Sequence, residues 1–330
     1  MEKLKAAIIG CGMIVEEGHL SAWARLSDRV TIAAIADRSE ARLKVIGDQL
    51  NLPPESRFTD YGQMLQQTQP DFADIALPHH LHRDAVSACC EAGVSVLLEK
   101  PVALEMVEVE EIVRRVKESS IKFSVIHNYK TIPLHANALA RVSAGDVGKP
   151  YLVRSEAIWA GAWPGAADGH SAGWRSRGDG IRVGAIQEYA YHNFYLAEAY
   201  MQSPVKDVQV RLLRTNDLLS GENIAVLTLG HENGGVSVIQ AGVGAAHFRR
   251  ADEIHGSSGS LELRFGEAES PLVLHNHEGA SRSLSVEGVD DWGFDGCFAQ
   301  FVDYLGDKAT APGPLEEAER VSRLIHRAYC

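Results

Sequence analysis

The sequence of 330 residues contains few cysteines, no long apolar run and no long run of basic residues. Its five cysteines form no CxxC pair, which argues against zinc sites and thioredoxin-like redox centres and favours a reducing compartment, the cytoplasm. No apolar stretch approaches the ~18 residues that a membrane-spanning helix requires. The apolar segment 6–15 is interrupted by glycines and lacks a cleavage site, so we interpret it as a buried strand rather than a signal peptide.

Positive charge is also scarce, because 32 lysines and arginines against 44 aspartates and glutamates give a formal net charge of −12. Without a run of Lys or Arg, this balance argues against nucleic acid or an anionic membrane and makes small molecules the expected partners. A content of 45% hydrophobic and 23% charged residues is typical of soluble globular proteins. The length suggests roughly two domains.

Short apolar runs alternate with amphipathic segments in the first third of the chain. Strands are expected at 5–10, 30–37, 72–77, 94–99 and 122–126, and helices at 19–26, 39–50, 61–67, 82–92 and 105–119. This alternation predicts an α/β domain, residues 1–125, with a doubly wound parallel sheet of the Rossmann type that binds a dinucleotide.

The pattern changes near residue 130, where longer candidate strands follow one another. They lie at 151–159, 205–213, 224–230, 236–242, 260–265 and 272–276, and helices are expected at 185–201, 294–305 and 315–329. Residues 126–330 are therefore expected to form an α+β domain with a large, mostly antiparallel sheet, involved in substrate binding and oligomerisation. The terminal helices can pack back on the first domain.

A glycine turn follows the first expected strand, since residues 6–12 read A-A-I-I-G-C-G. In a dinucleotide-binding unit Gly10 would form the tight turn, and Gly12 would let the backbone approach a pyrophosphate at the start of the next helix, near Met13 and Ile14. Val15 stands where the third glycine of the fingerprint is expected, so the match is partial.

Asp37 ends the second expected strand and strengthens the prediction of a dinucleotide site, because a carboxylate there would accept hydrogen bonds from the ribose hydroxyls. This favours NAD. The neighbouring Arg38 could instead meet a 2′-phosphate, which keeps NADP open.

Lys100 follows another apolar strand, in the triplet Glu99-Lys100-Pro101, and so lies at the carboxyl end of a parallel strand, where ligands bind. Taken alone, such a lysine is more often solvated. The histidines His79, His80 and His82 lack a supporting carboxylate motif, so no metal site is expected.

Several further motifs occur in one order along the chain. They are His19-Leu20-Ser21-Ala22, the segment 76–82 (A-L-P-H-H-L-H), Glu99-Lys100-Pro101, His127-Asn128-Tyr129-Lys130, Trp174-Arg175, Glu188 with His192, and the segment 256–261 (G-S-S-G-S-L). Together they resemble the Gfo/Idh/MocA oxidoreductases, the family of glucose-fructose oxidoreductase and inositol dehydrogenase. The sequence departs from that family in having Glu188 in place of Asp and only Gly184 of a glycine run.

The resemblance implies an NAD(P)-dependent dehydrogenase acting on a hydroxyl of a sugar, inositol, sugar acid or related polyol. Its implied catalytic residues are Lys100, His192 and Glu188. The expected cofactor-binding residues are Gly10, Gly12, Met13, Ile14, Asp37, Arg38, Leu77, Pro78, His79, His82, Glu99, Lys100 and Asn128. The expected substrate-binding residues are Lys100, Tyr129, Trp174, Arg175, Glu188 and His192.

Two other functions stay open at this point. Some relatives use NAD transiently to cleave glycosidic bonds without net redox, and others keep the fold as cofactor-binding regulators. The retention of Lys100 and His192 argues against the regulator. The resemblance also implies a homodimer or homotetramer that uses one face of the second sheet.

Overall fold

The computed structural model describes residues 3–161, 183–266, 271–288 and 291–330, and the contacts within the chain divide it into two units. The described part of the first unit is 3–128 and 294–322, and that of the second is 129–161, 183–266, 271–288, 291–293 and 323–330. The first unit therefore includes a helix that is distant in sequence, α9 (Phe294–Leu305).

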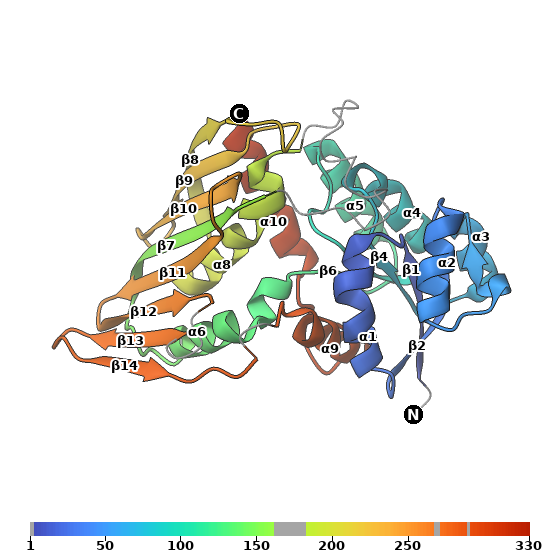
Figure 1. Cartoon of the computed structure of the whole chain (residues 1–330), viewed down its shortest axis with the longest axis horizontal. Coiled ribbons are helices and arrows are strands. Elements are labelled where there is room, and N and C mark those ends of the chain that lie inside the picture. The colour runs from blue at the N-terminus through green and yellow to red at the C-terminus, as the bar shows by residue number, and fades with distance from the viewer. Residues whose placement is uncertain (1–2, 162–182, 267–270, 289–290) are drawn as a thin grey trace. The chain divides into compact units, whose positions relative to one another are not determined.

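The first unit contains a sheet of six parallel strands in the order β3-β2-β1-β4-β5-β6. Figure 1 labels β1, β2, β4 and β6 of this sheet. The strands are β1 (Leu4–Ile9), β2 (Val30–Ala36), β3 (Arg57–Phe58), β4 (Phe72–Ile75), β5 (Ser95–Leu98) and β6 (Phe123–Val125). The strand order changes direction beside β1, the arrangement of a doubly wound sheet, and this confirms the predicted Rossmann-type fold. The two-residue strand β3 was not predicted.

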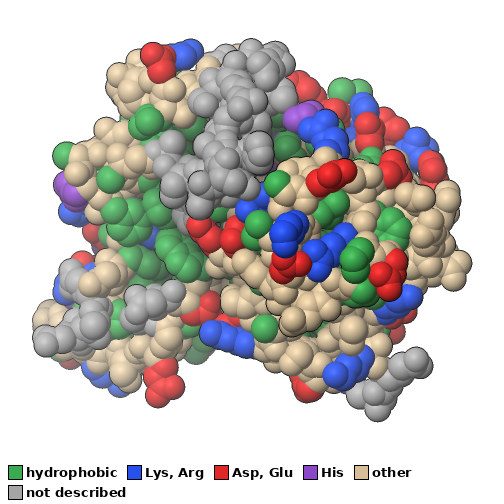
Figure 2. Space-filling model, turned by 45° about the vertical axis from the view of Figure 1, so that its right-hand side comes forward, with side chains coloured by type: hydrophobic (Ala, Val, Ile, Leu, Met, Phe, Trp, Pro, Cys, Tyr) green, Lys and Arg blue, Asp and Glu red, His purple; other side chains and the backbone are tan. Residues whose placement is uncertain are grey.

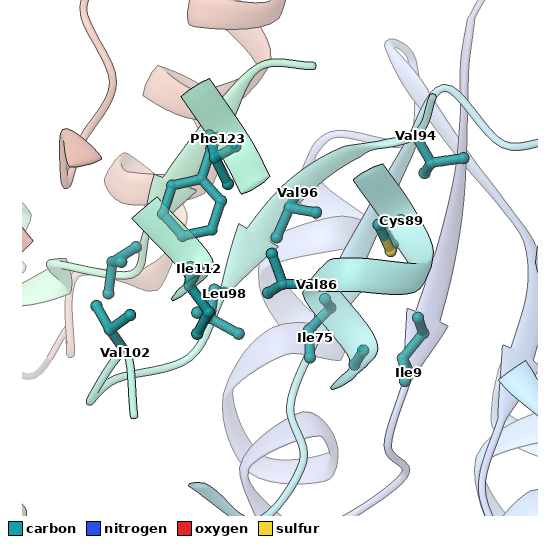
Figure 3. Packing of buried hydrophobic residues seen from close by; sticks show 14 of the residues in the cluster. Ile9, Ile75, Val86, Cys89, Val94, Val96, Leu98, Val102, Ile112 and Phe123 are labelled. Atoms are coloured by element: carbon teal, nitrogen blue, oxygen red, sulfur yellow. The ribbon is translucent and has the colours of Figure 1, made fainter. Parts of the chain in front are cut away.

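Helices cover both faces of this sheet. They are α1 (Leu20–Arg25), α2 (Glu40–Gln49), α3 (Tyr61–Thr68), α4 (His82–Ala92), α5 (Met106–Glu118) and α9. Successive strand residues point to opposite faces, so Ala7 and Ile9 pack in one apolar cluster with α3, α4 and α5, whereas Ala6 and Ile8 pack in another with α1, α2 and α9. Figure 3 shows the first cluster, where Cys89 of α4 lies over the strands.

Local signals in the sequence set the ends of several of these helices. Ser39 caps α2 by accepting a hydrogen bond from the backbone N–H of Arg42, and Asp60 caps α3 in the same way. Gly93 ends α4 at φ 70°, a left-handed conformation that glycine adopts readily.

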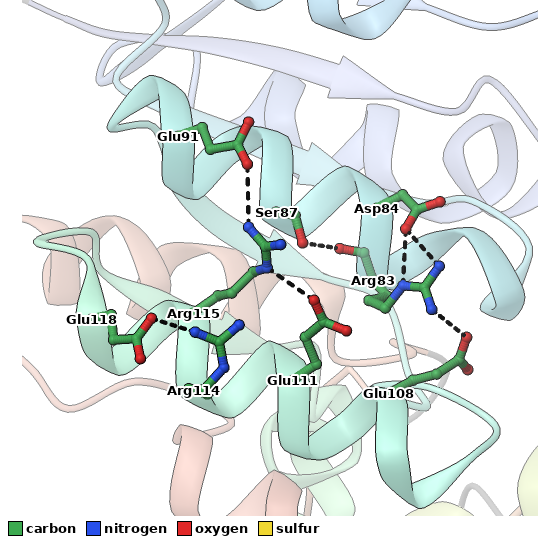
Figure 4. Close-up of polar contacts among 9 residues, drawn as sticks. All are labelled: Arg83, Asp84, Ser87, Glu91, Glu108, Glu111, Arg114, Arg115 and Glu118. Carbon is green, nitrogen blue, oxygen red and sulfur yellow. Dashed lines mark hydrogen bonds and ion pairs between the residues drawn. The ribbon is translucent and has the colours of Figure 1, made fainter.

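Ion pairs join the exposed surfaces of α4 and α5 (Figure 4). Arg115 Nη1 lies 3.1 Å from Glu91 Oε1, and Arg83 Nη1 lies 3.8 Å from Glu108 Oε1. Solvent screens such exposed pairs, so the buried apolar surfaces of α4 and α5 hold these helices on the sheet.

The second unit contains an eight-stranded sheet in the order β14-β13-β12-β11-β7-β10-β9-β8. The strands are β7 (Pro150–Trp159), β8 (Val205–Leu213), β9 (Ile224–His231), β10 (Val236–Val243), β11 (Arg249–Gly256), β12 (Gly259–Arg264), β13 (Leu272–Asn276) and β14 (Ser281–Leu284). All neighbours pair antiparallel except β7 and β10, which are parallel, so the predicted mostly antiparallel sheet is confirmed. The strands β11 and β14 were not predicted.

Two helices complete the described part of the second unit, α6 (Pro133–Ser143) and α8 (Tyr191–Met201), while α10 (Leu315–Tyr329) has residues in both units. Residues of α8 are buried around almost its whole circumference, and α8 contacts β7. The helix α6 was not predicted from the sequence.

On the face that Figure 2 shows, acidic and basic side chains are interspersed without a large patch of one sign. Within the described ranges, no helix has both the length and the apolar character that crossing a membrane requires.

Candidate functional site

Five of the predicted cofactor-site segments directly follow strands of the parallel sheet. Gly10 follows β1, Asp37 follows β2, Leu77 lies just beyond β4, Glu99 follows β5, and Asn128 lies just beyond β6. Because parallel strands end at the same edge of a sheet, all five segments lie along one edge, and ligands of doubly wound sheets bind there.

The glycine turn has the shape that a dinucleotide requires. Gly10 adopts φ 99°, and a Cβ atom on it would collide with the carbonyl oxygen of Ala76. A Cβ on Gly12, by contrast, would meet no atom within 4 Å, so this backbone has room beside it for a bulky group. Met13 is buried and Ile14 half-buried in the helical turn that follows. The turn therefore fits the pyrophosphate of NAD, which would lie against the backbone of Gly12.

Asp37 is bound to the glycine turn by its carboxylate. Oδ2 accepts the backbone N–H of Cys11 at 2.7 Å, and Oδ1 accepts that of Ser39 at 2.8 Å, which leaves further lone pairs for ribose hydroxyls. Arg38 is exposed.

Nothing in the sequence indicated a role for Arg42 at this site. Its buried guanidinium donates a hydrogen bond from Nε to the carbonyl oxygen of Cys11 at 2.7 Å and forms an ion pair with Glu16. Arg42 therefore helps to hold the backbone of the glycine turn in place.

The segment after β4 carries the predicted wall of the cofactor site. Leu77 and Pro78 are half-buried, and His79 is buried. His82 is fully buried, and its ring nitrogens lie 2.9 Å from the carbonyl oxygens of Leu77 and Pro101. Burial lowers the pKa of His82, against the opposing effect of these carbonyls. The side chain of His82 therefore joins the segment after β4 to the turn after β5.

That turn carries Glu99 and Lys100. The carboxylate of Glu99 is buried, with Oε2 accepting the backbone N–H of Lys100 at 2.9 Å and Oε1 lying 3.1 Å from Nε2 of His19. Burial raises the pKa of Glu99, but the bond to His19 and the charges of His19 and Lys100 outweigh it, so the pKa lies below its ordinary value. Glu99 is thus a buried carboxylate anion beside a half-buried lysine.

The second unit contains Tyr129 and His192, whose rings are stacked with centroids 3.7 Å apart. Nδ1 of His192 lies 2.7 Å from the hydroxyl of Tyr195, and the same hydroxyl accepts the backbone N–H of Tyr129 at 3.3 Å. The hydroxyl of Tyr195 therefore lies between the imidazole of His192 and the backbone of Tyr129, and it fixes the orientation of the His192 ring.

Glu188 lies one turn before His192, in a π-helical turn (Ile186–Ala190) that leads into α8. Single π-helical turns are frequent at functional sites, and this one was not predicted. Gly184 lies two residues before the turn, which is capped by a distant residue, because Oε1 of the buried Glu222 accepts the backbone N–H of Ile186 at 3.2 Å. A Cβ on Gly184 would collide with the carboxylate of Glu222, which explains the need for glycine there.

The structure thus brings the predicted residues into two groups. The first unit holds Gly10, Gly12, Met13, Ile14, Asp37, Arg38, Leu77, Pro78, His79, His82, Glu99, Lys100 and Asn128, and the second holds Tyr129, Glu188 and His192. Trp174 and Arg175 lie outside the described residues. Among the described residues, no group of three or more His, Cys, Asp or Glu side chains is arranged to hold a metal ion.

Comparison with known proteins identifies the family. Residues 4–127 match the model of an oxidoreductase family with an NAD-binding Rossmann fold, and residues 135–262 match the Gfo/Idh/MocA carboxyl-terminal domain. The two matches together span most of the chain. The protein therefore belongs to the Gfo/Idh/MocA family of oxidoreductases, and its first domain is an NAD-binding domain.

Individual relatives are more distant. The chain is 26% identical to D-apiose dehydrogenase of Paraburkholderia graminis, over 88% of this chain and 75% of the relative. It is 23% identical to myo-inositol 2-dehydrogenase of Thermotoga maritima, over 84% of this chain and 79% of the relative. One similar solved structure is the crystal structure of an oxidoreductase from Agrobacterium radiobacter in complex with NAD⁺, L-tartaric acid and magnesium. Its TM-score is 0.82 at 21% sequence identity, and the alignment covers 99% of this chain and 96% of that protein's chain. This similarity shows that the two proteins share a fold.

Proposed function

We propose that this protein is an NAD-dependent dehydrogenase that oxidises a hydroxyl carbon of a sugar, inositol, sugar acid or related polyol. The observation that carries the proposal is the half-buried Lys100, which follows the buried Glu99 on the sheet edge that also bears the glycine turn. The relatives named as D-apiose and myo-inositol dehydrogenases support a carbohydrate-like substrate.

Lys100 is the proposed acid–base group. Oxidation of an alcohol requires removal of the hydroxyl proton while the hydride leaves the same carbon, and an amine within hydrogen-bond reach can accept that proton. Bound NAD supplies the hydride acceptor. In the reverse direction the ammonium form of Lys100 returns the proton to the carbonyl oxygen.

His192 and Glu188 are the proposed partners of the substrate hydroxyls. Tyr195 holds Nδ1 of His192, and Nε2 is the ring nitrogen that would meet a substrate oxygen. Glu188, on the preceding helical turn, orients the imidazole or accepts a neighbouring hydroxyl. Tyr129, Trp174 and Arg175 complete the proposed substrate-binding set.

NAD is proposed over NADP because Asp37 follows β2, where a carboxylate would meet the ribose hydroxyls. A carboxylate there accepts hydrogen bonds from both hydroxyls and repels a 2′-phosphate. Gly10, Gly12, Met13 and Ile14 form the proposed pyrophosphate site, with the segment from Leu77 to His82, Glu99 and Asn128 on the nicotinamide side. The exposed Arg38 lies next to Asp37 and is the residue that would serve NADP.

The proposal is tested by following NADH absorbance with purified protein, NAD or NADP, and a panel of pentoses, hexoses, inositols, anhydrosugars and sugar acids. We expect NADH to accumulate with one substrate class and this signal to be lost in Lys100→Ala. Lys117→Ala on the exposed surface of α5 is the matched control and should retain the rate of the wild type.

Three outcomes would contradict the proposal. Undiminished activity in Lys100→Ala would exclude this lysine as the acid–base group. Release of an aglycone from a glycoside without NADH accumulation would instead identify a redox-neutral glycosidase, and NAD binding with neither reaction would indicate a regulator.

A further inference from the structure

His19 opens the motif His19-Leu20-Ser21-Ala22, to which no chemical role was assigned from the sequence, and it lies at the end of the π-helical turn (Val15–His19) that follows the glycine turn. Its side chain is fully buried. Nδ1 lies 3.0 Å from Oδ2 of Asp74 on β4, and Nε2 lies 3.1 Å from Oε1 of Glu99. The imidazole therefore bridges two carboxylates that belong to neighbouring strands.

The surroundings of this bridge are largely aromatic. The rings of Phe294 and Phe298 on α9 lie 5.3 and 5.0 Å from the imidazole, centroid to centroid. Trp23 Nε1 donates to the same Asp74 oxygen at 2.8 Å. The other oxygen of Asp74 accepts no hydrogen bond within the described residues, so His19 and Trp23 hold this carboxylate.

A neutral imidazole does not fit this position. It carries one N–H, so its second nitrogen would turn a lone pair toward a carboxylate oxygen at hydrogen-bond distance. With both nitrogens protonated, each carboxylate receives a charge-assisted bond. Burial alone lowers the pKa of His19, but the charges of Asp74 and Glu99 and the bonds to them outweigh it and raise the pKa to about 10.

Stability alone does not explain this cluster. Three aromatic rings surround the site, and an apolar side chain in place of a buried ion pair is often neutral or stabilising. What the ions add is a defined geometry, because the bonds continue from Asp74 through His19 to Glu99 and from Glu99 Oε2 to the backbone N–H of Lys100.

We propose that His19 is a positioning residue for the dehydrogenase reaction. By bridging Asp74 and Glu99, it holds the Glu99–Lys100 turn in a fixed position relative to the glycine turn. This places the amine of Lys100 for proton transfer. This inference rests on the proposed function of Lys100. His19 touches neither the substrate nor the reacting atoms and acts through Glu99.

The central test compares His19→Gln with the wild type, using the most active substrate of the panel. A glutamine amide can donate to one carboxylate only and turns its oxygen toward the other. We expect kcat to fall about tenfold or more, since misplacement of a reacting group by about 1 Å can cost that much, whereas KM changes much less. The dissociation constant of NAD, measured by tryptophan fluorescence, should change little.

A double-mutant cycle shows whether His19 acts through Lys100. In the Lys100→Ala background, His19→Gln should cause no further loss of the residual rate, because the positioned group is already absent. An unchanged kcat in His19→Gln, or a full additional loss in the double variant, would overturn the inference. If Lys100→Ala itself keeps full activity, the proposed function fails instead.

Asp74→Asn provides a second variant if His19→Gln does not fold. It keeps His19, Glu99 and Lys100 but removes one charge from the bridge, so His19 should lose its proton at a lower pH than in the wild type. We expect kcat in this variant to decline at an alkaline pH at which the wild type is still active. An unaltered pH profile in a folded Asp74→Asn variant, or failure of both variants to fold, would assign the cluster to folding alone and overturn the inference.

A spectroscopic measurement needs no substrate. In ¹⁵N–¹H NMR spectra, His19 should show two ring N–H groups at pH 8, assigned by their disappearance in His19→Gln. A single ring N–H at that pH would contradict the bridge.

Discussion

The ring of Tyr129 lies parallel to the imidazole of His192, with 3.7 Å between centroids and 7° between planes. The guanidinium of Arg250 lies 4.1 Å from the centre of the Tyr129 ring. Arg250 is itself buried and bonded to His135, so it is a fixed support. Tyr129 therefore connects His192 to a buried cation, and the orientation of His192 depends on Arg250 through the ring of Tyr129.

Replacing Tyr129 with leucine should lower kcat/KM about threefold to tenfold, because an aromatic stack contributes about 0.5–1.5 kcal/mol. Tyr129→Phe keeps the ring and the backbone N–H that binds Tyr195, so its kcat/KM should fall less than that of Tyr129→Leu. Steady-state kinetics of the two variants test this expectation, and an equal loss in both would show that the hydroxyl of Tyr129, rather than the stack, matters.

Asp37→Asn should weaken discrimination between NAD and NADP. The amide oxygen can still accept one of the two backbone N–H groups, but the negative charge that repels a 2′-phosphate is gone. We expect the ratio of kcat/KM for NAD to that for NADP to fall about tenfold, equal to about 1.4 kcal/mol. Asp60→Asn at the cap of α3 is a control that should leave the ratio unchanged, and an unchanged ratio in Asp37→Asn would remove Asp37 from the cofactor site.

Gly184→Ala should reduce both stability and activity. The added methyl group would collide with the buried carboxylate of Glu222, and overpacking of this kind costs about 1–3 kcal/mol. Because Glu222 caps the turn that bears Glu188, the displacement should also reach His192 and lower kcat. Thermal unfolding and kinetics measure the two effects. Gly306→Ala, where the nearest heavy atom to the new Cβ would lie 3.6 Å away, should leave both unchanged.

The free energy of unfolding should fall as the pH rises from 7.5 to 8.5. Folded His19, with a pKa of about 10, keeps its proton in this range, whereas the unfolded side chain, near 6.5, does not. The folded state then binds more protons, so His19 makes stability decrease with pH by at most about 1.4 kcal/mol per unit. The thiols of Cys11 and Cys89, whose pKa is raised by burial, add to the decrease in the wild type and in His19→Gln alike. Asp252, with a folded pKa of about 6, is already ionised and adds little to the slope. Urea unfolding at several pH values should give a shallower slope for His19→Gln, and equal slopes would contradict a protonated His19.

The sequence predicts elements well where apolar residues mark the buried face, as in the strands of the parallel sheet. It fails at β11, where the buried face bears Arg250 and Asp252 in place of apolar residues. These residues are accommodated because Arg250 bonds to His135 and Ser155 bonds to Asp252 across to β7. Such compensation depends on contacts between distant segments, which periodicity does not reveal.

In the candidate site, too, residues with a local signal could be predicted from the sequence, whereas residues that depend on distant contacts could not. Gly10, Asp37 and Lys100 could be chosen because each ends a recognisable strand. His19 could not be assigned a role, since its partners Asp74 and Glu99 are 55 and 80 residues away in sequence. Both π-helical turns were also unforeseen, because a π-helical turn has no distinct apolar period in a short window.

Isotope transfer tests the central claim most directly. Protein, NAD and a substrate carrying deuterium on the carbon that is oxidised are incubated, and the nicotinamide is examined by NMR. The account predicts one deuterium at C4 for each NADH formed, together with loss of the reaction in Lys100→Ala. Product formed while NAD stays unreduced, or NADH formed without deuterium, would contradict direct hydride transfer from a substrate carbon.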